Sequence, residues 1–440
     1  MRRTLLLATA GALLALAAGL ALRRPAGSLP GPAPSASTDD VALSHAEPAP
    51  RAPALAPEEP APLAGLDLER VTLSDGAASA PVDGGTARLT LDPSLQREAL
   101  GLMAARHLPE AAVVLMEVAT GKVLVYASHV DRGPARDLCA EARAPSASVF
   151  KIVTASALVE DAHLGPDTRE CYSGGEQRLT AADLVRDPER DRWCTTLAGA
   201  MGRSINTVFA RLAKERLTPA QLEGMAQRFG YGEPIAFDVP VQPGALHIPG
   251  EPLGFARTAA GFWNTTLSPL QAAEMSAIVA REGEPVRPRV VDDVVSPAGV
   301  VVPAARDPRA ARRVLSRDTA AQVAAMMERT VTEGTSYRAF HDGKSGAFLP
   351  GIPVAGKTGT LTEAETQRYY TWFTGFAPAR PAPAGGAPQV AVAALVVNGP
   401  SWQIKANVLA RDVLRAYFAE QGAQGVTRPS VRGVARRHRR

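Results

Sequence analysis

The placement of β-type runs at the two ends of the chain's body most constrains its fold. Five such runs occur, two early and three late: 111–118, 123–128, 352–360, 370–376 and 390–398. The early pair flanks a short turn and predicts a hairpin. Residues 148–331 are mainly helical in pattern, and residues 401–420 form an amphipathic helix. A sheet assembled from both ends of the chain, with helices between, predicts an α+β fold rather than alternating β-α-β units.

The two termini differ from this body. Residues 4–22 are uncharged, mostly apolar and flanked by arginines, and as a helix they are about 30 Å long, enough to span the hydrocarbon layer. Residues 1–24 therefore predict either an uncleaved signal anchor or a cleaved signal peptide, and both place the body outside the cytoplasm. Residues 25–86 are rich in Pro and Ala and predict a tether. We expect the folded domain at 87–421 and a basic, disordered tail at 422–440.

Charge and composition exclude several classes of protein. The net charge is +4, but the two ends carry ten arginines, and without them the net charge is −6. A basic face for nucleic acid is therefore not expected. The three cysteines are too few for a disulfide framework and form no C-x-x-C pair, and no H-x-x-x-H occurs. We expect no metal and no cofactor.

Lysine is rare in this chain. There are six lysines against 42 arginines. Because arginine does not deprotonate in proteins, a lysine that remains is a candidate for a titratable amine.

Three short motifs contain two of these lysines. They occur in the order Ser148-Val-Phe-Lys151, Ser204-Ile-Asn206 and Lys357-Thr358-Gly359-Thr360. Each is weak or moderate evidence alone, since Ser148 could cap a helix, Lys151 could be a solvated lysine and Gly359 could mark a turn. All three in this order, each occurring once, make chance improbable. The same set marks serine penicillin-binding proteins and β-lactamases.

The three motifs supply a nucleophile, a base and a route for proton transfer. A serine needs a nearby base to become a nucleophile, and residues i and i+3 of a helix lie on one face, so Lys151 can serve Ser148. To act as a base at neutral pH, Lys151 needs its pKa lowered by burial and by a second cation, for which Lys357 is the candidate. Ser204 can pass a proton between the lysines and to a leaving amine.

The remaining motif residues have expected binding roles. Asn206 can hydrogen-bond a peptide backbone, and Gly359 leaves room for a substrate beside its strand. The backbone N–H groups of Ser148 and Thr360 are the natural donors to an oxyanion.

From about residue 89 to 420 the chain resembles the transpeptidase domain of penicillin-binding proteins. The resemblance extends beyond the three motifs, to Leu91-Asp-Pro-Ser-Leu-Gln96, Ser268-Pro-Leu-Gln271 and Trp372-Phe-Thr-Gly-Phe-Ala-Pro378. It implies a five-stranded antiparallel sheet flanked by helices, with a mainly helical subdomain. No glycosyltransferase domain is recognisable before residue 89.

The activity that this resemblance implies is D,D-transpeptidation of peptidoglycan. Ser148 would attack the penultimate D-Ala of a stem peptide, release the terminal D-Ala and pass the acyl group to an amine. Thr358 and Thr360 would hold the terminal carboxylate, and β-lactams would acylate Ser148. The implied location of the protein is the bacterial inner membrane, where the N-terminal helix would anchor it with the catalytic domain in the periplasm. If the N-terminus is cleaved, the protein would be secreted to the periplasm. A separate glycosyltransferase is a possible partner.

Several alternatives stay open at this point. A D,D-carboxypeptidase has the same motifs. A β-lactamase is disfavoured because no asparagine has a Glu-x-x-Leu-Asn context and because Asn206 stands where another class has Val. A non-catalytic β-lactam sensor is disfavoured by the intact motifs. Cys171 and Cys194, with the stretch that ends in Ser204-Ile-Asn206, resemble the middle segment of the same family. These two cysteines could form a disulfide outside the cytoplasm or remain two buried thiols.

Overall fold

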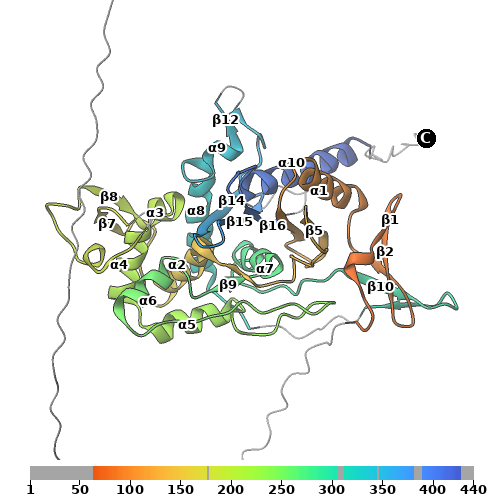
Figure 1. Cartoon of the computed structure of the whole chain (residues 1–440), viewed down its shortest axis with the longest axis horizontal. Coiled ribbons are helices and arrows are strands. Elements are labelled where there is room, and N and C mark those ends of the chain that lie inside the picture. Colours follow the sequence, from red (N-terminus) through yellow and green to blue (C-terminus); the bar gives the residue numbers. More distant parts are fainter. Residues whose placement is uncertain (1–62, 176–177, 305–311, 344–345, 381–388, 428–440) are drawn as a thin grey trace, which may run out of the picture. The chain divides into compact units, whose positions relative to one another are not determined.

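The computed structural model describes residues 63–175, 178–304, 312–343, 346–380 and 389–427. A five-stranded antiparallel sheet in the order β14-β15-β16-β4-β5 forms its centre (Figure 1). Its strands are β4 (Glu110–Glu117), β5 (Val123–Val130), β14 (Ala355–Glu363), β15 (Arg368–Ala377) and β16 (Val390–Asn398). The expected α+β fold, with its five-stranded antiparallel sheet flanked by helices, is confirmed.

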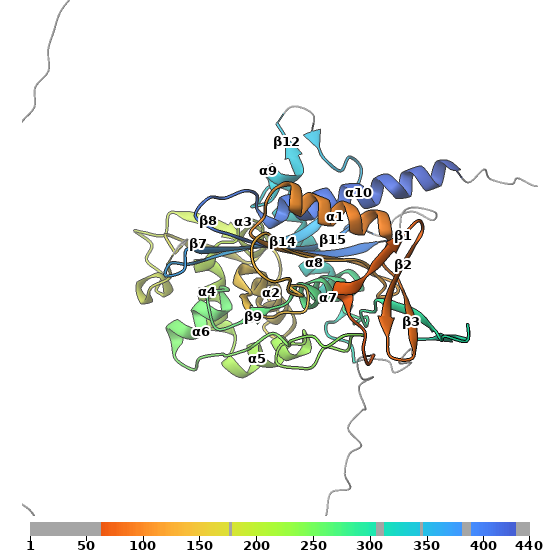
Figure 2. The same cartoon turned by 45° about the vertical axis from the view of Figure 1, so that its right-hand side comes forward.

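Helices cover both faces of this sheet, which Figure 2 presents nearly edge-on. On one face lie α1 (Pro93–Ala105) and α10 (Ala406–Thr427). On the other lie α7 (Pro269–Ala280) and α8 (Arg317–Thr332). All nine residues of β16 are buried, because alternate side chains enter the two cores. Burial on both faces explains why these strands are continuous apolar runs in the sequence.

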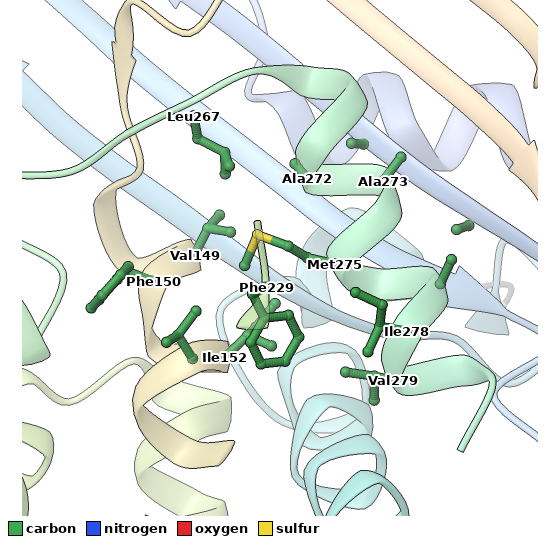
Figure 3. Packing of buried hydrophobic residues seen from close by; sticks show 14 of the residues in the cluster. Val149, Phe150, Ile152, Phe229, Leu267, Ala272, Ala273, Met275, Ile278 and Val279 are labelled. Atoms are coloured by element: carbon green, nitrogen blue, oxygen red, sulfur yellow. The ribbon is translucent and has the colours of Figure 1, made fainter. Parts of the chain in front are cut away.

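A second group of helices extends the core beyond the sheet. It contains α2 (Lys151–Glu160), α3 (Leu197–Arg203), α4 (Asn206–Arg216), α5 (Pro219–Arg228) and α6 (Pro252–Ala259). Figure 3 shows Val149, in the 3-10 turn directly before α2, and Ile152, at the start of α2, in the same apolar cluster as Met275 and Ile278 of α7. The start of α2 is therefore fixed by packing against the helix that covers the sheet.

A second five-stranded sheet, in the order β1-β2-β3-β10-β11, corrects the expected domain boundary. Its strands are β1 (Thr72–Ser74), β2 (Ala77–Val82), β3 (Gly85–Leu89), β10 (Val291–Val295) and β11 (Val301–Pro303). The expectation of a tether up to residue 86 is wrong for this stretch. These strands bury small residues such as Ala78 and Ala80. The ladder of β3 is completed by β10 and an Arg88–Asp293 ion pair, about 200 residues away in the sequence.

The other elements are short connections and hairpins. They are η1 (Leu68–Arg70), β6 (Ala144–Pro145), η2 (Ala147–Phe150), β7 (Arg169–Tyr172), η3 (Ala181–Leu184), β8 (Trp193–Thr196), β9 (Thr266–Leu267), α9 (Tyr337–Phe340), β12 (His341–Asp342) and β13 (Gly346–Ala347). Helix α10 continues to Thr427, past the expected end of the domain at 421. No helix within the described ranges is both long and apolar enough to cross a membrane. The expected anchor at 1–24, most of the tether and the tail from 428 onward lie outside the described residues.

Candidate active site

Ser148 and Lys151 lie where η2 leads into α2. Ser148 is partly exposed, whereas the side chain of Lys151 is fully buried. The Lys151 ammonium group donates a hydrogen bond to Ser148 Oγ at 2.7 Å. The expected pairing across one helical turn is thus present in the structure, and it joins a buried amine to a hydroxyl that solvent can reach.

Two further acceptors hold Lys151 from other parts of the fold. Its Nζ donates to Asn206 Oδ1 at 2.7 Å and to the backbone oxygen of Ala260 at 2.6 Å. Burial away from water lowers the pKa of Lys151 well below its ordinary value of 10.5, and the charge of nearby Lys357 lowers it further. The carbonyl of Ala260 was not foreseen, because no side-chain motif announces a backbone acceptor.

Lys357 and Ser204 form a second amine–hydroxyl pair. Lys357 lies on β14, the edge strand of the central sheet, and Ser204 ends α3 in a left-handed conformation with φ of 60°. Lys357 Nζ donates to Ser204 Oγ and to the backbone oxygen of Thr358, both at 2.8 Å. Desolvation of this buried amine lowers the pKa of Lys357 to about 7. Two buried lysines with lowered pKa values therefore flank one site.

Asn206 contacts two other parts of the fold. Its amide oxygen accepts from Lys151, and its amide nitrogen donates to the backbone oxygen of Gly175 at 3.0 Å. In this structure the side chain thus positions Lys151, and its expected hydrogen bonds to a peptide backbone stay a prediction.

The three residues after Lys357 take different positions along β14. A Cβ on Gly359 would lie only 3.0 Å from Ala147 Cβ and 3.2 Å from Trp372 Cβ. The glycine therefore allows the η2 turn to approach the strand, and the expected room for a substrate beside it stays a prediction. Thr358 Oγ1 lies 2.6 Å from the hydroxyl oxygen of Thr335. No sequence motif pointed to Thr335. Thr360 is exposed.

The candidate catalytic and binding residues of the three motifs, except the two buried lysines, line one cavity of about 490 Å³. Its lining includes Ser148, Ser204, Asn206, Thr358, Gly359 and Thr360 from the motifs, together with Tyr172, Arg203, Ile205, Thr335, Thr371, Trp372, Lys405 and Asn407. The structure thus brings the three separated motifs to one pocket that a ligand can enter.

A hairpin beside this pocket contains the two cysteines of the middle segment. Cys171 on β7 and Cys194 on β8 are directly opposite each other and form a disulfide, while Cys139 is a buried free thiol. The buried Arg211 donates to the backbone oxygen of Cys171 at 2.8 Å and pairs with Asp191 at 2.7 Å. These contacts fix the hairpin whose Tyr172 lines the pocket.

Comparison with known proteins agrees with this geometry. The chain is 26% identical over 322 residues to Stage V sporulation protein D of Bacillus subtilis, covering 68% of this chain and 48% of that protein. It is 28% identical over 364 residues to peptidoglycan D,D-transpeptidase PbpA of Mycolicibacterium smegmatis, covering 72% and 68% of the two chains. The chain thus spans about half to two thirds of the length of these relatives.

A solved structure and a family match complete the comparison. The D,D-transpeptidase domain of a peptidoglycan glycosyltransferase from Eggerthella lenta superposes with a TM-score of 0.62 at 25% identity, covering 77% of this chain and 84% of that one. Residues 111–415 match the penicillin binding protein transpeptidase domain, a range that contains all three motifs and the whole central sheet except the first residue of β4. With the fold, the motif geometry and this match in agreement, the chain belongs to the penicillin-binding protein transpeptidase domain family.

Proposed function

We propose that this protein is a peptidoglycan D,D-transpeptidase that works through a Ser148 acyl-enzyme. The observation that carries the proposal is the 2.7 Å contact between Ser148 Oγ and the buried amine of Lys151, whose pKa burial lowers. A neutral amine at this distance can accept the serine proton as the hydroxyl attacks. Family membership supports the same chemistry, and the D,D-transpeptidase name of the mycobacterial relative supports the substrate class.

In the proposed acylation step, each group around Ser148 has a role. Ser148 Oγ attacks the carbonyl carbon of the penultimate D-Ala, and its proton moves to Lys151 Nζ. The backbone N–H groups of Ser148 and Thr360 stabilise the oxyanion. As the C–N bond breaks, the Ser204–Lys357 pair delivers a proton to the leaving amine of the terminal D-Ala. The hydroxyls of Thr358 and Thr360 hold its carboxylate.

Deacylation reverses these roles. An amine on a neighbouring stem attacks the Ser148 ester, loses a proton to the lysine–serine network and leaves a new amide bond. Ser148 Oγ regains a proton. A β-lactam enters as a mimic of the stem terminus and stays on Ser148. The proposed location is the bacterial inner membrane with the catalytic domain in the periplasm, supported by the apolar run at 4–22, and a separate glycosyltransferase is the proposed source of glycan strands.

Covalent labelling tests the nucleophile. Fluorescent penicillin should label the protein, and Ser148→Ala should abolish labelling, because no other hydroxyl in the described pocket lies beside Lys151. Ser94→Ala, on the exposed surface of α1, is the matched control and should label like the wild type. Labelling that survives in Ser148→Ala contradicts the proposal.

Product analysis separates the two closest activities. Mass spectrometry of a D-Ala-D-Ala stem peptide incubated with and without an acceptor amine should show a cross-linked product with the acceptor. Hydrolysed tetrapeptide alone in both reactions identifies a D,D-carboxypeptidase, and steady turnover of penicillin identifies a β-lactamase.

A further inference from the structure

The lining of the pocket around Ser148 comes from two different parts of the fold. The central sheet supplies a sheet wall, which consists of Thr358, Thr360 and Trp372. Strand β7 and the end of α3 supply a hairpin wall, which consists of Tyr172, Arg203 and Ser204. The proposed function places the donor stem on the sheet wall, where threonine hydroxyls hold its carboxylate. A transpeptidase also binds a second stem, the acceptor, and the hairpin wall is left for it.

The acceptor amine has to reach Ser204 on the hairpin wall. In the proposed deacylation this amine attacks the Ser148 ester and gives its proton to the lysine–serine network, in which Lys357 Nζ lies 2.8 Å from Ser204 Oγ. Arg203 directly precedes Ser204 and is the last residue of α3. The hairpin wall therefore presents a cation beside the place where the acceptor amine loses its proton.

Arg203 is available to bind an anion. Its side chain is exposed, and no hydrogen bond or ion pair joins it to any residue in the described ranges. Two other arginines of this region differ, because Arg186 pairs with Glu170 at 2.7 Å and Arg211 pairs with Asp191 at 2.7 Å. The described residues that line the pocket include no Asp or Glu. A carboxylate of a ligand would therefore meet Arg203 with no acidic side chain of the lining to compete for it.

The β7–β8 hairpin supplies a second and independent feature, a pair of aromatic rings on a fixed backbone. Trp193 is 63% exposed, and its ring centroid lies 6.4 Å from that of Tyr172, which lines the pocket. The Cys171–Cys194 disulfide joins the two strands, and the buried Arg211 holds the backbone of β7. A rigid surface loses little conformational entropy when a ligand packs against it, so these rings are prepared for a contact.

The aromatic pair and Arg203 are connected by a short, closely packed stretch of chain. Strand β8 ends at Thr196, whose hydroxyl caps α3 by accepting from the backbone N–H of Gly199 at 3.1 Å. A Cβ on Gly199 would clash with Thr195 Oγ1, so the helix packs directly on the strand. Helix α3 then ends at Arg203. The rings and the cation are therefore held in fixed positions relative to each other.

We infer that Arg203 and the Tyr172–Trp193 pair form the binding surface for the acceptor stem. Arg203 binds a carboxylate of that stem, and the aromatic pair packs against its peptide chain. The inference rests on the proposed function and adds to it the place and the charge preference of the second substrate.

Two acceptor dipeptides test the role of Arg203. N-acetyl-L-Lys-D-Ala and its C-terminal amide present the same side-chain amine, but only the first has a carboxylate. With a D-Ala-D-Ala stem peptide as the donor, mass spectrometry gives the ratio of aminolysed to hydrolysed donor for each acceptor. Both products come from the same acyl-enzyme, so this ratio depends neither on the acylation rate nor on the fraction of folded protein.

The wild type should prefer the acceptor with the carboxylate. Its aminolysis ratio should be about threefold to fivefold higher with the acid than with the amide, the size expected for one solvent-exposed charge pair. High salt should reduce this preference, because it screens such a pair. In Arg203→Gln the preference should fall to near one, and Arg203→Lys, which keeps the charge, should retain part of it.

A second variant tests the aromatic pair. Trp193→Ala should lower the aminolysis ratio with both dipeptides more than with glycinamide, a small amine that cannot reach the hairpin. Equal losses with all three amines would contradict packing of the acceptor against these rings. Arg216→Gln, at an exposed arginine on α4, is the matched control for Arg203 and should keep the wild-type preference.

The outcomes separate this inference from the proposed function. A wild type that uses the acid and the amide equally, or an Arg203→Gln variant with an unchanged preference, overturns the acceptor surface and leaves the proposed function standing. A protein that releases D-Ala but forms no aminolysed product with any of the three amines is a carboxypeptidase. That result overturns the proposed function, and the acceptor surface with it.

Discussion

The surroundings of Lys151 and Lys357 differ although both are buried amines that donate to a serine. Lys151 is enclosed by helices and makes three hydrogen bonds, to Ser148, Asn206 and Ala260. Lys357 lies on an edge strand and makes two, to Ser204 and to its own neighbour Thr358. The pKa of Lys357 falls to about 7, and that of Lys151 falls well below its ordinary value with Lys357 as a contributing charge.

This difference suits the two amines to different roles. Burial lowers the pKa of both, and the charge of Lys357 lowers the pKa of Lys151 further, so a proton on Lys357 favours the neutral, basic form of Lys151. In its charged form Lys357 can attract a carboxylate. Residues of the same type thus acquire complementary roles from their environments.

Lys151→Ala should produce the largest effect. Removing the base should lower the second-order rate of penicillin acylation on the order of 10³- to 10⁴-fold. Stopped-flow fluorescence with a labelled penicillin measures this rate. The same substitution at Lys214, exposed on α4, should leave it unchanged. If Lys151→Ala acylates within tenfold of the wild type, Lys151 is not the base.

Lys357→Ala should have a smaller effect with a distinct pH dependence. Loss of one cation that attracts the substrate carboxylate should lower acylation by on the order of 10²-fold. In the wild type the rate should rise as Lys151 loses its proton and fall as Lys357 loses its own, with the falling limb near pH 7. The variant should lose this falling limb. A wild-type rate that keeps rising to pH 9 would show that the charge on Lys357 is not required.

Asn206→Asp should shift the pH profile rather than remove activity. A carboxylate beside Lys151 Nζ, in place of the amide oxygen now at 2.7 Å, favours the charged amine and raises the pKa of Lys151. The rising limb of the acylation profile should therefore move to higher pH, with about a tenfold loss at neutral pH for a shift of about one unit. Asn206→Ala is the uncharged comparison and should lower the rate without that alkaline shift. An unmoved limb in Asn206→Asp would argue against coupling between these residues.

Lys357→Met should have the smallest effect, and it is one on stability. In the folded protein the pKa of Lys357 is about 7, below its ordinary value of 10.5, so the buried amine destabilises the fold most at and below pH 7. That cost declines as the pH rises from about 7 toward 10.5, because the unfolded chain then binds more protons than the folded one. Melting temperatures should show a larger gain for Lys357→Met at pH 6 than at pH 9.5. The reverse order would contradict the lowered pKa.

The central sheet was predictable, whereas the second sheet was not. Strands buried on both faces, such as Val390–Asn398, appear as apolar runs that the sequence shows directly. The strands at 72–89 are short and bury alanines against a partner about 200 residues away. No local pattern distinguishes such a strand from a Pro/Ala-rich tether, because its stability comes from a distant ladder.

The sequence by itself determined the reacting groups, because the spacing of Ser148 and Lys151 across one helical turn is a local property. Tertiary structure alone decided how those groups behave. The lowered pKa values of Lys151 and Lys357 come from burial by helices and strands far apart in the chain. The fold likewise brings the Ala260 carbonyl to Lys151 and leaves Asn407 Oδ1 without a hydrogen-bond partner among the described residues. Solvation and charge proximity depend on three-dimensional distance, which residue order does not specify.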